Sequence, residues 1–306
     1  MKQKVIVIAG PTASGKSEMG VKLASALGGE VISADSVQVY RGADIGSAKI
    51  TEREMAGIPH HLINIMGVNE RFSAGEFARL ANEKINEISA RGHIPIIVGG
   101  TGLYISALLF PLSSGAPRDD ALRNELYKIN EEKGSEALYR LLEEIDPKTA
   151  REVFASQTDR IVRAIEIYKT TGKKKSELTK TTTPNYDYIM FVLNEDREIL
   201  YERINARVDK MVDDGLMSEV IGLIKNHNLN EKSPLLFGIG YREIFDCINE
   251  KISVDEAVDL IKQHSRNYAK RQLTWFKKVP NVINVSRFDY DEILSLCKTF
   301  LKPNGE

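Results

Sequence analysis

A glycine-rich segment near the N-terminus constrains the fold of this chain more than any other feature. The segment follows an apolar run at residues 5–9 and reads Gly10-Pro11-Thr12-Ala13-Ser14-Gly15-Lys16-Ser17. The order strand, loop of spacing G-x-x-x-x-G-K-S and helix is the arrangement that holds phosphates against backbone N–H groups and a helix N-terminus. We therefore expect a diphosphate or polyphosphate site here, although the pattern does not identify the ligand.

Two side chains of this loop have expected roles of their own. Lys16 is expected to supply a cation for phosphate oxygens, and the Ser17 hydroxyl is the expected ligand for Mg²⁺. Many ATPases with such a loop also have an apolar strand that ends in a metal-binding Asp, but glycines follow the apolar run at 94–98. The sequence thus disfavours an ATPase or a motor and favours a small transferase or a kinase-like enzyme.

Apolar runs with strand character alternate with helical patterns along the chain. The expected strands lie at residues 5–9, 31–34, 61–65, 94–98, 189–193 and 282–285. A helix expected at 72–91 begins with the capping-box pattern Ser73-x-x-Glu76 and stops at Gly92. The alternation predicts an α/β fold with a doubly wound parallel sheet flanked by helices, in which ligands bind at the carboxyl ends of the strands.

Strand patterns disappear between residues 117 and 183. Charged helical segments dominate there, at 119–133, 135–145 and 159–171. We predict that 117–183 forms a helical insertion domain. The flanking parts, 1–116 and 184–306, are predicted to form the α/β core, with further helices at 199–212 and 254–276.

The composition is ordinary for a soluble protein, with 306 residues, 42% hydrophobic and 28% charged. No apolar run reaches transmembrane length, and the first residues lead directly into a strand, so we expect neither a membrane span nor a signal peptide. Two cysteines, Cys247 and Cys297, are too few for a disulfide framework or a zinc site. A cytoplasmic location is the simplest expectation.

One segment is locally basic although the net charge of the chain is −1. Residues 262–278 include no acidic residue and carry Lys262, Arg266, Lys270, Arg271, Lys277 and Lys278. Solvated helix faces usually mix charges of both signs, so this segment favours a polyanionic partner. The interleaved Tyr268, Trp275 and Phe276 either pack in the core or stack on bases.

Asp35 comes just after the strand expected at 31–34, on the same sheet edge as the phosphate-binding loop. It could ligate Mg²⁺ through water, accept a proton from a substrate, or close a turn, and position alone does not decide. Arg203 and Arg207 share a helix face at i,i+4, for which an ordinary surface pair is the simpler interpretation. For the adjacent His60-His61, a structural role is favoured over a metal site.

Taken together, these motifs resemble the tRNA dimethylallyltransferase family, the IPP transferases, which prenylate an adenosine beside the anticodon. The resemblance extends along nearly the whole chain. Besides the phosphate-binding loop it rests on SADSVQVYR at 33–41, DIGSAK at 44–49, GIPHHL at 57–62, GGTGLY at 99–104, DRIVRAIE at 159–166, GIGYRE at 238–243 and YAKRQLTWF at 268–276. Departures are small, because Ser17, Ser47 and Asn64 stand where the family often has Thr, Thr and Asp.

The resemblance implies a P-loop NTPase-like core with a mobile helical insertion. It also implies that the loop holds dimethylallyl diphosphate rather than ATP, although the loop pattern by itself fits an ATP-binding site. The implied reaction transfers the dimethylallyl group to the N6 amine of adenosine at tRNA position 37 and releases diphosphate. The implied catalytic residues are Asp35 as the base, Thr101, and Lys16 and Arg207, which with Mg²⁺ at Ser17 stabilise the leaving group.

The same match implies which residues contact the tRNA anticodon stem-loop. They are Asp35, Ser36, Val37, Gln38, Thr101, Arg123, Asp159, Arg160, Ile161, Val162 and Arg163. The target adenine would have to leave its stack to reach Asp35. A monomer is the expected oligomeric state.

Three other functions stay open at this point. An adenylate isopentenyltransferase performs the same chemistry on a free nucleotide, a P-loop kinase phosphorylates a small molecule, and a nucleotide-binding RNA adaptor catalyses nothing. The helical insertion and the basic segment 262–278 favour a partner of the size of tRNA over a free nucleotide. An adaptor would need no base at Asp35.

Overall fold

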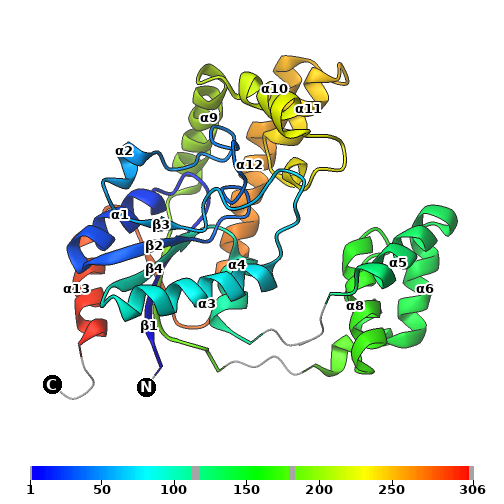
Figure 1. Cartoon of the computed structure of the whole chain (residues 1–306), viewed down its shortest axis with the longest axis horizontal. Coiled ribbons are helices and arrows are strands. Elements are labelled where there is room, and N and C mark those ends of the chain that lie inside the picture. The colour runs from blue at the N-terminus through cyan, green and yellow to red at the C-terminus, as the bar shows by residue number, and fades with distance from the viewer. Residues whose placement is uncertain (1, 112–117, 179–182, 303–306) are drawn as a thin grey trace. The chain divides into compact units, whose positions relative to one another are not determined.

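A computed structural model of the chain consists of two compact units (Figure 1). The larger unit combines Met1–Leu109 with Asn185–Glu306, and the smaller unit spans Phe110–Pro184. The structure describes residues 2–111, 118–178 and 183–302. The boundary predicted between 116 and 117 falls outside these ranges.

The larger unit is built on a six-stranded sheet in the order β3-β2-β4-β1-β5-β6. Its strands are β1 Lys4–Ala9, β2 Gly29–Ser33, β3 His60–His61, β4 Ile94–Gly99, β5 Asp187–Leu193 and β6 Val282–Val285. Every neighbouring pair is parallel. The α/β prediction of a parallel sheet flanked by helices is therefore confirmed.

The register aligns the carboxyl ends of the strands along one edge. Ala9 at the end of β1 pairs with Gly99 at the end of β4, and Leu193 at the end of β5 pairs with Val285 at the end of β6. Loops that are far apart in sequence therefore meet beside the phosphate-binding loop. In open α/β sheets this edge is where ligands bind.

The strand predicted at 61–65 is wrong beyond its first residue. β3 ends at His61 because Leu62 and Asn64 have left-handed backbone angles, with φ of 61° and 56°, which a strand does not permit. The capping box predicted at 73–76 forms only in part. Ser73 Oγ accepts from the N–H of Glu76, whereas the Glu76 carboxylate pairs with Arg79.

Helices cover both faces of the sheet. The helices of the larger unit are α1 Lys16–Leu27, α2 Glu52–Met55, α3 Ala74–Ala90, α4 Gly102–Leu109, α9 Arg197–Asp213, α10 Leu216–His227, α11 Tyr241–Ile248, α12 Val254–Phe276 and α13 Tyr290–Leu301. Helices α1 and α13 bury Leu23 and Ile293 against Ile6 and Ile96. Alternate strand residues point to the other face, where α3 and α4 pack against each other and against β4.

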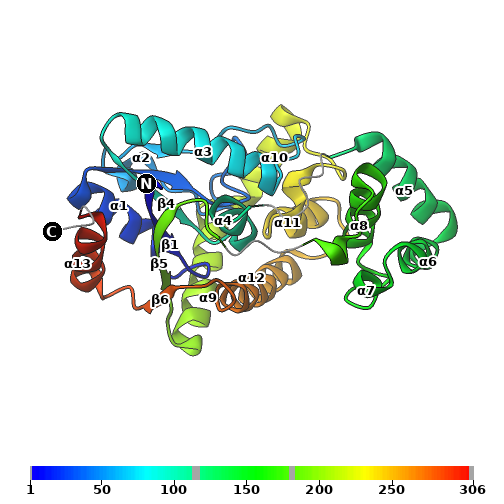
Figure 2. The same ribbon diagram turned by 90° about the horizontal axis from the view of Figure 1, so that it is seen from below.

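Helices α9 and α12 lie side by side (Figure 2). α12 begins with a complete capping box between Ser253 and Glu256, and its buried side chains recur every three or four residues. Val208 of α9 and Ile261 of α12 join a hydrophobic cluster with Val39, which belongs to the chain just after β2. This packing fixes both helices beside the carboxyl edge of the sheet.

The smaller unit is helical throughout residues 118–178. It contains α5 Asp120–Lys133, α6 Ser135–Ile145, α7 Pro147–Ala150, α8 Thr158–Thr171 and the 3₁₀ turn η1 Lys175–Glu177. Leu126, Leu138, Leu142 and Ile165 form its apolar core. Within the described ranges of the whole chain, no helix combines the length and the apolar character needed to cross a membrane.

Candidate active site

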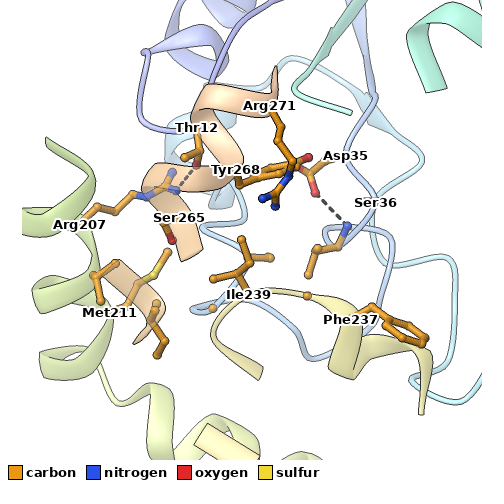
Figure 3. Close-up of a pocket in the computed structure, with 16 residues that line it drawn as sticks. Thr12, Asp35, Ser36, Arg207, Met211, Phe237, Ile239, Ser265, Tyr268 and Arg271 are labelled. Carbon is orange, nitrogen blue, oxygen red and sulfur yellow. Dashed lines mark hydrogen bonds between the residues drawn. The ribbon is translucent and has the colours of Figure 1, made fainter. Parts of the chain in front are cut away.

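A cavity of about 200 Å³ lies at the carboxyl edge of the sheet in the larger unit (Figure 3). Segments far apart in the sequence form its walls. Thr12 comes from the phosphate-binding loop, Asp35 from the chain after β2, Arg207 from α9, and Tyr268 from α12. The structure thus brings several residues singled out from the sequence into one cavity.

The phosphate-binding loop has the geometry of an anion site. Gly10 has a φ of 154°, and a Cβ there would lie 2.9 Å from both the Leu193 carbonyl oxygen and Ser14 Oγ, so only glycine fits. Gly15 caps α1 without a side-chain bond, which leaves N–H groups of the first turn available to a ligand. Ser14 Oγ is buried and has no hydrogen-bond partner among the described residues. An anion in the loop would satisfy these donors.

Lys16 in the phosphate-binding loop and Arg207 in the cavity wall bring positive charge to this edge of the sheet. Burial lowers the pKa of Lys16 to about 8 and that of Arg207 to about 10, while the charge of Asp35 acts in the opposite direction on both. Lys16 Nζ donates to the Pro11 carbonyl at 3.2 Å, and the Arg207 guanidinium donates to Thr12 Oγ1. Two cations held out of water beside a phosphate-binding loop favour an anionic ligand.

Two further arginines lie over the phosphate-binding loop. A Cβ on Gly15 would meet both Arg287 and Arg203 within 3.9 Å. Both reach Glu195, with Arg203 Nη1 at 3.6 Å and Arg287 Nε at 3.3 Å from Oε2. These two nitrogens and Arg207 Nε are buried and lack hydrogen-bond partners among the described residues.

These arginines change the sequence interpretation. The reading of Arg203 and Arg207 as an ordinary surface pair is wrong, because both side chains turn toward the phosphate-binding loop. Sequence reasoning also missed Glu195 and Arg287. Their position in the sequence could have indicated a role in the site. Each comes two residues after the carboxyl end of a strand, and ligands bind at these ends in open α/β sheets.

Asp35 has a structural role that uses one of its two carboxylate oxygens. Its Oδ1 accepts from the N–H groups of Val37 at 2.9 Å and Gln38 at 3.3 Å, which closes a turn after β2. Thr101, after β4, accepts from the Ser36 N–H at 3.1 Å. The two loops are therefore tied together, and Asp35, Ser36 and Val37 line the cavity.

Gln38 and Ser17 lie away from this cavity. The Gln38 amide donates to the Ala48 carbonyl at 3.2 Å and its oxygen accepts from Ser33. Both Gln38 and Ser17 line a separate cavity of about 20 Å³. Gln38 therefore holds the loop that carries Asp35, and its predicted contact with RNA stays a prediction.

Gln272 of α12 is a buried connector that sequence reasoning did not single out. Its Oε1 accepts from the Thr12 N–H and its Nε2 donates to the Gly100 carbonyl, both at 2.9 Å. A Cβ on Gly100 would lie 2.2 Å from Nε2, so the glycine permits this close approach. One helix thus fixes the loops after β1 and β4.

Comparison with known proteins identifies the family. The IPP transferase family model matches residues 38–279. A tRNA dimethylallyltransferase of Geobacillus kaustophilus is 48% identical over 292 residues, which cover 94% of this chain and 91% of that protein. The chain belongs to the IPP transferase family. A tRNA dimethylallyltransferase of Bacillus cereus is 45% identical over 94% of this chain and 90% of its own length.

Solved structures agree with this assignment. The tRNA isopentenylpyrophosphate transferase of Bacillus halodurans is 42% identical, with a TM-score of 0.72 over 98% of this chain and 97% of that one. A eukaryotic dimethylallyltransferase acting on tRNA is 29% identical, with a TM-score of 0.84 over 99% of this chain and 81% of that one. The relatives therefore share the whole architecture of this IPP transferase.

The basic segment of this IPP transferase is only partly available to a polyanion. Lys262 Nζ lies 2.5 Å from Asp209 of α9, and Arg266 donates to Asn205 of α9 at 2.6 Å. Polar residues of the neighbouring helix α9 therefore bind two of the cations in 262–278, although this segment has no acidic residue of its own. The remaining cations, Lys270, Arg271, Lys277 and Lys278, are exposed.

Arg271 also belongs to the cavity wall, where its guanidinium lies 5.6 Å from the centre of the Tyr268 ring. The three aromatic residues of this segment have different surroundings. Phe276 is buried in the core, whereas Tyr268 lines the cavity. Trp275 is partly exposed and donates to Ser106 Oγ at 3.0 Å.

The predicted RNA contacts in the helical unit surround a buried ion pair. Glu166 is fully buried and accepts from Arg123 at 2.7 and 2.8 Å and from Arg163 at 2.5 Å. Burial alone would raise the pKa of Glu166, but these hydrogen bonds and one from the Asp119 N–H lower it to about 2. Arg123 thus has a structural role in this unit.

The remaining predicted contacts lie on α8. Ile161 and Val162 are fully buried in the core of the helical unit, so their side chains are not available to RNA in this structure. Asp159 accepts from the Tyr127 hydroxyl at 2.6 Å. Asp159 and Arg160 are exposed and Arg163 is half-buried, so for these three side chains contact with RNA stays a prediction.

The two adjacent histidines are structural, as favoured from the sequence. His61 Nε2 and His93 Nδ1 each lie 2.7 Å from the buried carboxylate of Glu30, which also pairs with Arg91 at 2.8 Å. His60 Nδ1 contacts the Ile58 carbonyl at 2.8 Å. In the described ranges, no cluster of three or more His, Cys, Asp or Glu side chains could hold a metal.

Proposed function

We propose that this IPP transferase transfers the dimethylallyl group of dimethylallyl diphosphate to the N6 amine of adenosine 37 in tRNA and releases diphosphate. The placement of Asp35 in one cavity with Thr12 of the phosphate-binding loop and with Arg207 carries the proposal. That arrangement puts a proton acceptor beside a site for an anionic leaving group. The tRNA dimethylallyltransferases that match over most of this chain support the same reaction.

In this reaction the N6 nitrogen attacks the allylic C1 carbon. A C–N bond forms, the C1–O bond breaks, and its electron pair leaves with diphosphate. The phosphate-binding loop, Lys16 and Arg207 stabilise the negative charge that develops on the diphosphate oxygens. Because these cations are already held out of water, they need little reorganisation as the bond breaks.

Asp35 accepts the proton that the amine loses. The N6 lone pair is delocalised into the adenine ring, so the nitrogen gains nucleophilicity as this proton is removed. The N–H groups of Val37 and Gln38 bind Oδ1, which fixes the orientation of the carboxylate. Thr101, through Ser36, holds the loop in place and is assigned a positioning role.

Mg²⁺ is the proposed metal, and Ser17 is its proposed protein ligand. Mg²⁺ commonly binds through one or two protein oxygens together with substrate phosphates and water. Ser17 follows Lys16 in the first turn of α1, next to the phosphate-binding loop. Bound there, it would add positive charge to the leaving group.

The anticodon stem-loop is the proposed acceptor, as expected for an enzyme whose relatives act on tRNA. Exposed Lys270, Lys277 and Lys278 on the larger unit suit phosphate contacts. In the helical unit, burial lowers the pKa of Lys175, and the nearby charges of Arg160 and Arg163 act in the same direction while Glu152 and Asp146 oppose it, so cations gather at this place. We propose that the enzyme acts as a cytoplasmic monomer, which light scattering would test.

The decisive experiment incubates the protein with radiolabelled dimethylallyl diphosphate and either unmodified tRNA or AMP. Label in tRNA, lost when adenosine 37 is replaced by guanosine, is the expected result. Label in AMP alone would indicate an adenylate isopentenyltransferase. Consumption of ATP with a phosphorylated product would indicate a kinase, and tRNA binding without transfer would indicate an adaptor.

A further inference from the structure

Phe237 is an exposed aromatic residue at the edge of the cavity. Its side chain is 86% exposed and belongs to the cavity wall (Figure 3). Single exposed apolar side chains are common on proteins and need no explanation in themselves. Among the large apolar residues that are exposed in the described ranges, however, Phe237 alone lines this cavity.

The backbone that carries this ring is anchored in the core. Phe237 ends the 3₁₀ turn η2 Pro234–Phe237, in which Leu235 and Leu236 are buried at 1% and 3% exposure. The N–H of Gly238 donates to the Leu235 carbonyl at 2.8 Å. The two leucines therefore anchor the turn in the core, and the ring is held outside it.

The turn that carries Phe237 packs against the loop of Asp35. A Cβ on Gly238 would lie 3.2 Å from Val37 Cγ1, so the backbone after Phe237 packs closely on the residue two positions beyond Asp35. Arg271, on the opposite wall, places a cation at the same cavity. An aromatic face and a cation at one opening match the bases and phosphates of a single-stranded nucleic acid.

We propose that Phe237 stacks on a base adjacent to the target adenosine. This inference rests on the proposed function, because extruding adenosine 37 leaves the faces of its neighbours without their stacking partner. An aromatic ring replaces that partner, as is usual when proteins bind RNA loops. The exposed ring costs hydrophobic free energy in the unbound protein, and the stacked base removes it from water.

The test compares Phe237→Ala, Phe237→Leu and Phe237→Trp for binding to an anticodon stem-loop. Stacking on one base contributes about 1–3 kcal/mol, so Phe237→Ala should weaken binding roughly 5- to 150-fold. Phe237→Trp should restore the affinity, whereas Phe237→Leu, which keeps an apolar side chain, should not. The KM for dimethylallyl diphosphate should stay at its wild-type value in all three.

Two further measurements separate stacking from a general loss of exposed apolar surface. Val254→Ala alters an exposed apolar residue that does not line the cavity, and it should bind the stem-loop as the wild type does. With 2-aminopurine at position 36 or 38, one of the two labels should be quenched on binding to the wild type and to Phe237→Trp, and less by Phe237→Ala.

Unchanged stem-loop affinity of Phe237→Ala would overturn the proposal. A higher KM for dimethylallyl diphosphate with normal RNA affinity would also overturn it, because the ring would then cover the donor. Failure of the proposed function looks different, since the wild-type protein itself would then transfer no label to tRNA.

Discussion

Two groups of arginines in this molecule have opposite surroundings. In the helical unit, Arg123 and Arg163 share the buried carboxylate of Glu166 and hydrogen-bond to it. At the phosphate-binding loop, Arg203, Arg207 and Arg287 keep buried nitrogens without hydrogen-bond partners among the described residues. Buried charge is tolerated when it is paired, so the first group is explained by the fold itself. In the second group, Arg203 and Arg287 share the single carboxylate of Glu195, and the buried nitrogens that stay without hydrogen bonds favour an anionic ligand.

Asp35 is the acidic residue that lines the cavity together with Arg207. We expect the replacement of Asp35 to reduce activity most. Asp35→Asn keeps an oxygen for the N–H groups of Val37 and Gln38 but removes the proton acceptor. We expect kcat to fall about 10²- to 10⁴-fold in single-turnover assays of tRNA prenylation. Affinity for dimethylallyl diphosphate should change little. Turnover near the wild-type rate would assign the base elsewhere.

Removing one arginine from the group at the phosphate-binding loop should lower activity without lowering the stability of the fold. Arg207→Met keeps an apolar stem but removes the cation, so kcat/KM should fall about 10²- to 10³-fold. In the wild type, burial disfavours the charged form of Arg207, as the lowered pKa of about 10 indicates. The free energy of unfolding should therefore stay equal or rise, which urea denaturation would measure. A clear loss of stability would show that Arg207 is structural.

Glu166→Gln tests the paired group. It removes the buried negative charge that Arg123 and Arg163 both bind, so we expect a loss of about 3–5 kcal/mol in the free energy of unfolding. Glu144→Gln, on an exposed position of the same unit, is the matched control. In the wild type, the folded pKa of about 2 lies below the unfolded value of 4.5, so this contribution should be lost as the pH falls from about 4.5 to 2.

The pH dependence of anion binding should reveal Lys16. Its pKa of about 8 in the free protein means that the cation disappears as the pH rises through 8, whereas a bound anion favours the charged form. Affinity for inorganic diphosphate should therefore fall by up to about tenfold per pH unit above 8, with proton uptake in calorimetry. Lys16→Gln should bind more weakly and lose this inflection; an inflection that survives in Lys16→Gln would arise from another group.

The smallest expected effect concerns the exposed cations of α12. The double variant Lys270→Ala/Lys277→Ala should flatten the salt dependence of tRNA binding by roughly one unit of slope per lost phosphate contact. Arg266→Ala should leave the slope unchanged, because Arg266 is hydrogen-bonded to Asn205. Equal slopes for all three proteins would remove α12 from the RNA-binding surface.

Local patterns were read well from the sequence because their causes are local. The loop at 10–17 depends on glycines at fixed spacing, and α12 on a capping box and a helical period, all of which are visible in one dimension. The prediction for β3 was wrong because Leu62 gives no sequence signal for its left-handed angle, and Asn64, which adopts such angles more readily, is only a weak one. The sequence also offered Glu76 an i,i+3 partner in Arg79, and local spacing alone did not decide between that pair and the cap.

The sequence by itself determined the phosphate-binding loop, the parallel α/β core and, through its ordered motifs, the family. Only the tertiary structure decided which charges are free for a ligand. Lys262 has its counter-ion on another helix, and Arg287 reaches the phosphate-binding loop from beyond the last strand. The reason is physical: the energy of a charge depends on burial and on neighbours within a few ångströms, and folding chooses those neighbours from the whole chain.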